Sequence, residues 1–312
     1  MKKYAFGVDI GGTTIKMGFF ETNGTLLDTW EVPTRTQENG KYILTDIAEE
    51  TEKKLKEKSI SSLDVEGIGM GVPGPVGADG TVFKCVNLGW GIFNVEEELK
   101  RLTNLKVKAG NDANVAALGE MWQGGGRGYK NLVMVTLGTG VGGGIIIDEH
   151  ILPGTNGAAG EIGHMPMKDN ETETCGCGKK GCLEQYASAT GTVTMMKRYF
   201  KEHEQSESSL KNMDFTAKDI FDAAKAGDKA ALETMDEVGI MLGKALASIA
   251  CVVNPEVFVI GGGMAKAGDI LLNCIQKHYT EYAFHAACDT HFKAAELSNN
   301  AGIYGGVRLV LE

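Results

Sequence analysis

The sequence predicts an α/β fold made of two domains, and three observations support this. The chain has 312 residues, whereas single hydrophobic cores usually stop growing at about 250 to 300 residues. Strand-like apolar segments alternate with helical segments, which is typical of α/β folds. A unit of strand, glycine turn and strand occurs twice in the chain, at residues 4–20 and 132–147. We therefore expect two lobes separated by a cleft.

The elements of the first half follow from hydrophobic pattern and glycine punctuation. In chain order they are strands at 4–10 and 15–20, a charged amphipathic helix at 42–58, a strand at 67–72 ending at Pro73, a strand at 107–110 and a helix that begins at Asp112.

The part of the chain after residue 131 opens with two strands and then becomes mainly helical. Its predicted elements are strands at 132–137 and 144–147, helices at 185–203, 216–226 and 229–253, a strand at 257–260 and a last helix at 300–311. Thr216 is the expected N-cap of its helix, with Asp219 completing a capping box. Asn254 and Pro255 end the long helix.

The overall composition restricts the function. Hydrophobic residues make up 43% of the chain, as in ordinary globular proteins, and the net charge of −10 disfavours nucleic acid as a partner. The sequence contains neither a membrane-spanning apolar run nor a secretory signal, so we expect a cytoplasmic protein without a membrane partner. Seven cysteines, an odd number, favour metal binding over disulfides there.

Glycine turns supply successive backbone N–H groups that can hold phosphate oxygens. Residues 138–143 match the GxGxxG pattern, but a strand follows instead of the helix that a dinucleotide-binding fold needs. The GxxxxGK[ST] phosphate loop is not in the sequence. A single glycine turn could be a plain hairpin, yet turns at 11–14 and 138–143 and a glycine run at 261–263 together favour a nucleotide site.

Asp112 is the candidate general base. Phosphoryl transfer needs alignment, charge neutralisation and a carboxylate directed at the attacking hydroxyl. Asp112 lies where a strand is followed by a helix, next to Asn111. The alternative is that Asp112 only caps the helix, since aspartate is a favoured N-cap residue.

A second candidate site contains one histidine and three closely spaced cysteines. His164, Cys175, Cys177 and Cys182 offer one nitrogen and three sulfurs, the donor set of a closed structural zinc site. Glu161 and Glu184 flank these ligands, so closing the site brings two carboxylates into one region that could bind sugar hydroxyls. The alternative is that the cysteines are reduced bystanders.

These motifs together resemble the ROK family of sugar kinases and sugar-responsive repressors. The resemblance extends over nearly the whole chain and is most specific at residues 161–164 and 175–184. It implies an actin-like (ribonuclease H-like) two-lobe fold, with one lobe at 1–115 plus 299–312 and the other at 116–298. It also implies a homodimer or homotetramer.

The resemblance assigns roles to individual residues. Asp112 is the implied base, and the implied sugar-binding residues are Gly74, Asn87, Asn111, Asp112, Glu161, His164 and Glu184. The implied ATP-binding residues, near which Mg²⁺ is required, are Asp9, Gly11, Gly12, Thr13, Thr14, Lys16, Gly138, Thr139, Gly140, Gly261, Gly262 and Gly263. His164 would use one ring nitrogen for zinc and the other for the sugar.

The implied activity is ATP-dependent phosphorylation of a hexose. Residues 87–90 and 293–302 look most like the bacterial glucokinases of the family, so glucose is the expected substrate. N-acetylmannosamine and fructose stay open, because pocket shape decides between them and residue spacing does not show it. A sugar-sensing repressor is disfavoured, since such proteins carry a basic DNA-reading domain before the segment that contains Asp9.

Overall fold

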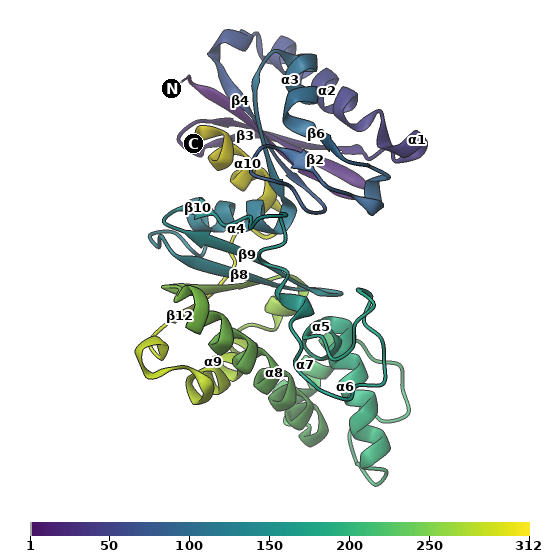
Figure 1. Ribbon diagram of the computed structural model, residues 1–312. Coiled ribbons are helices and arrows are strands. Elements are labelled where there is room, and N and C mark those ends of the chain that lie inside the picture. The colour runs from purple at the N-terminus through teal and green to yellow at the C-terminus, as the bar shows by residue number, and fades with distance from the viewer. Residues whose placement is uncertain (1) are drawn as a thin grey trace. The chain divides into compact units, whose positions relative to one another are not determined.

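The computed structural model describes residues 2–312 and divides into two compact units (Figure 1). The first unit comprises the chain up to Lys130, Gly144–Gly160 and Glu296–Glu312. The second comprises Asn131–Gly143 and Glu161–Ala295. Both contain strands and helices, so the predicted α/β class is confirmed.

The first sheet is built around three parallel strands. Its order is β3 (Leu26–Pro33), β2 (Thr14–Glu21), β1 (Tyr4–Ile10), β4 (Val65–Val72) and β7 (Lys106–Asn111). Strands β1, β4 and β7 run parallel, while β2 and β3 run antiparallel beside β1. Asp9 lies opposite Gly71, and Val72 lies opposite Asn111, so the carboxyl ends of the three parallel strands meet at one edge.

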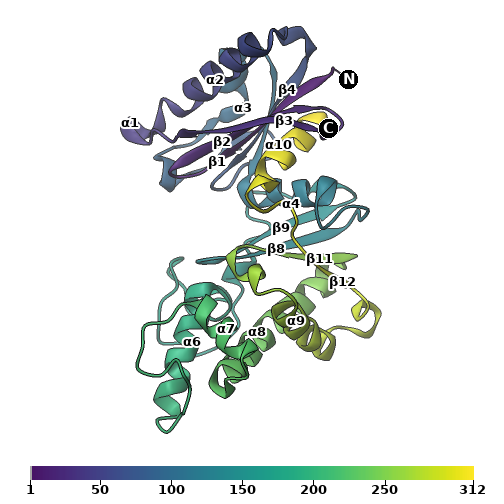
Figure 2. The same ribbon diagram turned by 180° about the vertical axis from the view of Figure 1, so that it is seen from behind.

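Helices cover both faces of this sheet (Figures 1 and 2). Successive residues along β1 point to opposite faces of the sheet. Phe6 and Val8 pack with α2 (Ile43–Lys58) and α3 (Val95–Thr103), whereas Ala5 packs with α10 (Ala301–Leu311). Gly7 allows a close approach of α10, because a Cβ atom there would lie 1.9 Å from the Ile303 carbonyl oxygen. Short elements of this unit include α1 (Gln37–Gly40), β5 (Thr81–Val82) and β6 (Phe93–Asn94).

Helix α4 (Asp112–Gln123) also belongs to the first unit, because it packs on α10. A Cβ atom on Gly305 would lie 1.7 Å from the Val115 carbonyl oxygen, so the two helix backbones touch. The predicted lobes, 1–115 with 299–312 and 116–298, therefore differ from the compact units. In the structure, α4 and the segment Gly144–Gly160 belong to the first unit.

The second sheet repeats the strand order of the first. Its order is β10 (His150–Ile151), β9 (Val141–Ile147), β8 (Leu132–Leu137), β11 (Val257–Gly261) and β12 (His291–Ala294). In both sheets, the first three strands in sequence lie side by side and are followed by two later parallel strands. The two similar strand, turn and strand units predicted from the sequence, β1 with β2 and β8 with β9, therefore occupy equivalent places.

Helices of the second unit cover its parallel strands (Figure 2). They are α5 (Glu184–Ala187), α6 (Ala189–Glu202), α7 (Ala217–Lys225), α8 (Lys229–Val253) and α9 (Asp269–Tyr282). Tyr279 of α9 packs edge-on against Phe258 of β11 and Phe292 of β12. None of the helices within residues 2–312 combines the length and the apolar character that crossing a membrane requires.

Two predicted helix boundaries have clear outcomes. The capping box of Thr216 and Asp219 is confirmed, with both reciprocal hydrogen bonds formed. The single helix predicted at 185–203 is wrong, because Ser188 has extended backbone and divides it into α5 and α6. Ser188 caps the new helix by accepting a hydrogen bond from the Gly191 N–H.

Candidate active site

In the first unit, Asp9 and Asp112 lie close together at the carboxyl ends of the parallel strands. A Cβ atom on Gly71 would lie 3.3 Å from Asp112 Cα and 3.6 Å from Asp9 Oδ1, so both residues lie next to this glycine. Gly302 in α10 leaves room for the Asp9 carboxylate from the other side. Ligands of open α/β sheets commonly bind at this edge.

Burial is the main reason that the pKa of Asp9 is raised to about 6. The nearby Asp112 charge raises it further, and Lys16, which lies opposite Asp9 on β2, partly offsets the effect. The protein therefore holds two carboxylates together at a cost in stability. A divalent cation or a developing positive charge would relieve that cost.

The helix cap next to Asp112 is made by Asn111. Its side-chain oxygen accepts hydrogen bonds from the N–H groups of Ala113 and Asn114, at 3.0 and 3.2 Å. The Asn111 amide donates to Asp112 Oδ1 at 3.0 Å and to the Gly74 carbonyl at 3.2 Å. The alternative in which Asp112 is only the N-cap is wrong, because α4 begins at Asp112 and its cap is Asn111.

Asn87 and Gly74 lie in the loops beside this strand edge. Gly74 has φ 136°, a conformation that favours glycine, and its carbonyl receives the Asn111 amide. Asn87 is exposed in the short 3₁₀ turn Val86–Leu88. Hydrogen bonds thus bring Asn111 together with Asp112 and Gly74. The Asn87 side chain is exposed to solvent.

The first glycine turn is anchored at one end and open at the other. The Gly11 N–H donates to the Thr14 carbonyl at 2.9 Å, and Thr34 Oγ1 donates to the Gly11 carbonyl at 2.7 Å. Gly12, Thr13 and Thr14 are exposed, and nothing lies within 4 Å of a Cβ atom built on Gly12. A phosphate group could approach this backbone.

The second unit contains a cavity of about 470 Å³ beside the second glycine turn. This volume falls in the usual range of small-molecule sites. Gly138 of the turn is held by the Ala189 N–H of α6, at 2.8 Å. The lining residues are Gly138, Thr139, Ala189, Thr216, Ala217, Lys218, Phe221, Asp222, Lys225, Gly263, Met264, Lys266 and Ala267.

Of the predicted nucleotide-binding residues, Gly138, Thr139 and Gly263 line this cavity. Gly262 has φ 84° and packs against the Leu137 backbone, so its role is to bring the ends of β8 and β11 together. The apolar wall formed by Phe221 and Met264 was not predicted from the sequence. Their only local signal was the capping box at Thr216, which places α7 but does not show what its face covers.

The cysteine loop, residues 161–184, gathers the four predicted metal ligands. The donor atoms of His164, Cys175, Cys177 and Cys182 all lie within 4.8 Å of one another. Cys177 Sγ is 3.6 Å from Cys182 Sγ, and Cys175 Sγ is 3.7 Å from His164 Nδ1. Zinc–sulfur bonds of about 2.3 Å at tetrahedral angles require sulfur–sulfur separations of about 3.8 Å. The donor set and its spacing therefore fit a four-coordinate zinc ion.

Glu184 and Glu161 lie beside these ligands, as the sequence predicted. His164 Nδ1 is 3.6 Å from Glu184 Oε1, and His164 Nε2 is 3.8 Å from Glu161 Oε2. The two ring nitrogens thus face different partners. A Cβ atom on Gly140 would lie 2.7 Å from Glu184 Oε2, so this carboxylate also borders the second glycine turn.

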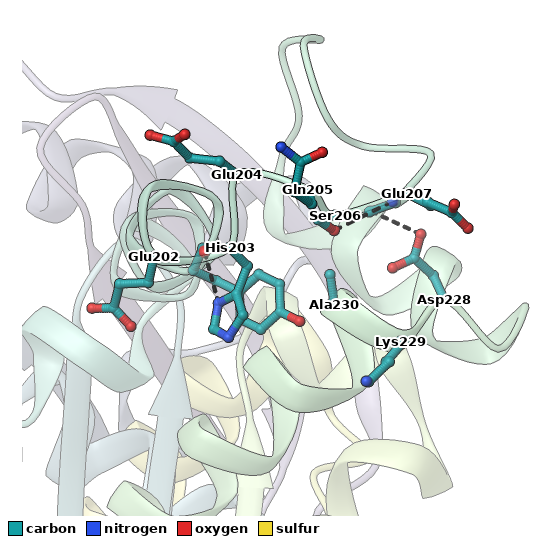
Figure 3. A pocket seen from close by; sticks show the side chains of 11 residues that line it. Glu202, His203, Glu204, Gln205, Ser206, Glu207, Asp228, Lys229 and Ala230 are labelled. Atoms are coloured by element: carbon teal, nitrogen blue, oxygen red, sulfur yellow. Dashed lines mark hydrogen bonds between the residues drawn. The ribbon is translucent and has the colours of Figure 1, made fainter.

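A second cavity, of about 590 Å³, lies between the end of α6 and the start of α8 (Figure 3). The carboxylates of Glu202, Glu204 and Glu207 point in different directions (Figure 3), so they do not converge on a ligand. The His203 ring stacks on Tyr199. Ser208 donates to Asp228 at 2.8 Å. These groups mainly hold the 203–212 loop.

One further group of possible metal donors is present in residues 2–312, at Asp236, Cys274 and His278. Its polar atoms are already paired: His278 Nε2 is 2.8 Å from Asp236, and Lys277 Nζ is 3.0 Å from the same carboxylate. The other ring nitrogen of His278 contacts Glu281 at 3.1 Å. This cluster joins α8 to α9 through ion pairs.

Comparison with known proteins decides the family. The model of the ROK family matches residues 5–312. The chain belongs to the ROK family. It is 47% identical to a glucokinase of Halalkalibacterium halodurans, with 99% of this chain and 95% of that protein covered. A Thermotoga maritima glucokinase is 35% identical, with 98% of this chain and 96% of that protein covered.

A solved structure confirms the fold of this ROK protein. A ROK family glucokinase from Streptomyces griseus, in complex with glucose and AMPPNP, has a TM-score of 0.73 and 32% identity. The match covers 98% of each chain. The predicted actin-like two-lobe sugar kinase fold is therefore confirmed, as is the resemblance on which it was based.

Proposed function

We propose that the protein phosphorylates glucose with ATP, giving glucose 6-phosphate. The observation that carries this proposal is the arrangement of the cysteine loop in a member of the ROK family. Glu184 lies between His164 of that loop and Gly140 of a glycine turn, so groups suited to sugar hydroxyls border groups suited to phosphate. The glucokinases described above support glucose as the acceptor.

In this mechanism Asp112 is the general base. It accepts the proton of the attacking hydroxyl as that oxygen bonds to the γ-phosphorus and the bond between the γ-phosphorus and the bridging oxygen breaks, releasing ADP. Asn111 orients Asp112 through the hydrogen bond to Oδ1 and binds a sugar hydroxyl together with the Gly74 and Asn87 loops. Phosphoryl transfer asks little further covalent chemistry of the protein.

The nucleotide is assigned to the glycine turns and the cavity of the second unit. The adenine ring would rest against Phe221 and Met264, beside the glycine run 261–263. The phosphates would accept hydrogen bonds from the backbone of Gly12 and Gly140 and from the threonines of the two turns, Thr13, Thr14 and Thr139. Mg²⁺ would neutralise phosphate charge near Asp9 and Lys16. The raised pKa of Asp9 is in keeping with a carboxylate placed to receive a cation.

The cysteine loop would bind the remaining hydroxyls of the sugar. Glu161 and Glu184 accept hydrogen bonds from hydroxyl groups, and the outward nitrogen of His164 adds a further contact. A zinc ion held by His164 and three cysteines would clamp this surface without an open coordination position. Zinc analysis of the purified protein, with about one equivalent expected per chain, tests this assignment.

A coupled ADP-release assay with glucose, N-acetylmannosamine, fructose, mannose and allose tests the proposed function. Glucose is expected to give the highest kcat/KM with Mg-ATP. No sugar raising ADP release above background would contradict the kinase assignment. A preference of about tenfold or more for N-acetylmannosamine or fructose would replace glucose as the substrate and keep the reaction.

The same proposal extends to the setting of the enzyme. We place it in the cytoplasm as a homodimer or homotetramer whose partners are its hexose and ATP, with neither nucleic acid nor membrane. The acidic composition and the thiol-rich metal site are in keeping with this setting. Light scattering after size-exclusion chromatography measures the assembly, and a monomeric mass would contradict the oligomer.

A further inference from the structure

Glu171 is a buried carboxylate within the cysteine loop, outside the groups already assigned. It lies between His164 and Cys175, and only 5% of its side chain is exposed. Tyr186 donates its hydroxyl to Glu171 Oε2 at 2.6 Å. Arg198 donates to both carboxylate oxygens, at 2.9 and 3.1 Å. The backbone N–H groups of Thr172 and Glu173 complete the set at 2.8 and 3.2 Å.

These bonds join three separate parts of the second unit. Glu171 belongs to the loop, Tyr186 to α5 and Arg198 to α6. Helix α5 is a single short turn that begins at Glu184, and Tyr186 within it is fully buried. A hydrogen bond from Glu171 to this ring therefore restrains the turn that carries the Glu184 carboxylate.

The ends of the loop are fixed by other means. Short bridges pair Pro166 with Cys182 and Thr174 with Lys180. Glu171 lies between these bridges in sequence. The ion pair with Arg198 therefore ties the middle of the loop to α6.

The surroundings of Glu171 keep its carboxylate ionised and paired with Arg198. Hydrogen bonds from Arg198 and Tyr186 hold the pKa of Glu171 far below its usual range. Buried ion pairs are often no more stabilising than well-packed apolar side chains, so a bidentate pair at this place is better explained by the geometry that it fixes.

We propose that Glu171 is a positioning residue for sugar binding. Through Tyr186 and Arg198 it holds α5, and with it Glu184, in the orientation that accepts sugar hydroxyls beside His164. The inference rests on the proposed function, since it names what sets the sugar side of that same site. It needs no contact between Glu171 and the sugar.

The test compares Glu171→Gln with Glu173→Gln in the full-length zinc-loaded protein. Glu173 is a matched control, because its side chain is 60% exposed and lies 3.4 Å from the same arginine. We expect Glu171→Gln to raise the glucose KM, and the glucose Kd measured calorimetrically without ATP, by about tenfold or more. The KM for ATP and the zinc content should change by less than about twofold, and Glu173→Gln should behave as wild type.

Tyr186→Phe supplies a second variant that removes a single hydroxyl. It should raise the glucose Kd by about threefold or more and leave zinc and ATP binding unchanged. If Glu171→Gln does not fold, the glucose Kd of Tyr186→Phe tests the positioning role, and an unchanged Kd would then overturn the inference. An unchanged glucose Kd in folded Glu171→Gln would overturn the inference. An equal loss of glucose affinity, ATP affinity and zinc would also overturn it, because that pattern reports general disruption.

The wild-type protein separates this inference from the proposed function. If wild type phosphorylates none of the five sugars, the proposed function fails and the inference falls with it. If wild type is active and both glutamate variants bind glucose equally well, only the inference fails.

Discussion

The strand edge of the first unit and the cysteine loop of the second unit hold their carboxylates in opposite ways. At the strand edge, Asp9 and Asp112 lie together and the pKa of Asp9 is raised to about 6. In the loop, Arg198 and Tyr186 surround Glu171 and hold its pKa well below the usual range. The first region buries the Asp9 carboxylate beside a like charge, and the second uses opposite charges to fix a backbone that regular structure does not hold.

This difference reflects what supports each region. Asp9, Gly71 and Asn111 are placed by the hydrogen-bond register of parallel strands, which is formed without any ligand. The residues 165–175 are not in a helix or strand and depend on side-chain links and on the proposed metal. Substitutions at the strand edge should therefore lower turnover, whereas substitutions in the cysteine loop should weaken glucose binding.

The largest effect is expected at Asp112. Replacing Asp112 with Asn should lower kcat by about a thousandfold, because the base that accepts the hydroxyl proton is lost. Glucose affinity and the melting temperature should be nearly unchanged, since the strands still place the residue. Exposed Asp214, changed to Asn, is the control. Turnover near the wild-type rate in Asp112→Asn would remove Asp112 from the mechanism.

The cysteine loop should respond through binding. Cys182→Ser, or removal of metal by a chelator, should weaken glucose affinity by about ten- to a hundredfold and lower the melting temperature, as expected for a ligand shell that shapes a site. Exposed Cys251, changed to Ser, is the control. Full activity without bound zinc would show that the loop does not need a metal.

Asp9→Asn and Glu171→Gln should change stability in opposite directions. An aspartate pKa raised from 3.8 to about 6 corresponds to about 3 kcal/mol of destabilisation at neutral pH. Asp9→Asn should therefore raise the free energy of unfolding, measured in urea without Mg²⁺ or nucleotide. Exposed Asp64→Asn is its control, whereas Glu171→Gln should lower that energy. A destabilised Asp9→Asn protein would contradict the description of Asp9 as a buried, destabilising charge.

The smallest expected effect is the pH dependence of the changes in unfolding free energy caused by Asp9→Asn and Glu171→Gln. Asp9 binds more protons when folded, so its penalty is present above about pH 6 and disappears as pH falls towards 4. The lowered pKa of Glu171 acts in the opposite sense: its contribution is present above about pH 4.5 and is lost as pH falls further.

Urea unfolding from pH 3 to 7 measures both differences. The Asp9→Asn advantage should shrink first as acid is added, and the Glu171→Gln deficit should shrink at lower pH. Parallel curves for wild type and either variant would contradict the corresponding shift.

The sequence predicted the strand edge more completely than the loop. Asp9 and Asp112 each lie next to a recognisable strand end, and the cysteine spacing is a strong local pattern. Glu171, Tyr186 and Arg198 form no such pattern, since they meet only when the loop folds onto two helices. Phe221 and Met264 were missed for the same reason, as each looks like an ordinary apolar helix or turn residue.

Local signals also failed where two neighbours compete for one role. Asp112 and Asn111 are both good N-cap residues, and only the structure shows that Asn111 takes the cap. The break at Ser188 was missed because the residues on both sides favour helix, whereas Ser188 and its hydrogen bond to the Glu184 carbonyl set the boundary.

The glycine contacts of α10 have a consequence for the order in which the chain folds during synthesis. Gly7, Gly69 and Gly305 let this helix touch the first sheet and α4 directly, and Ile303, Val307 and Val310 fill the space between. At about 5 to 20 residues per second, roughly 8 to 30 seconds separate the synthesis of Lys130 from that of Glu296. During that interval, while the chain is still on the ribosome, the surface of the first sheet and α4 that α10 later covers is exposed to solvent. The second unit can therefore complete its core before the first, although its segments are made later.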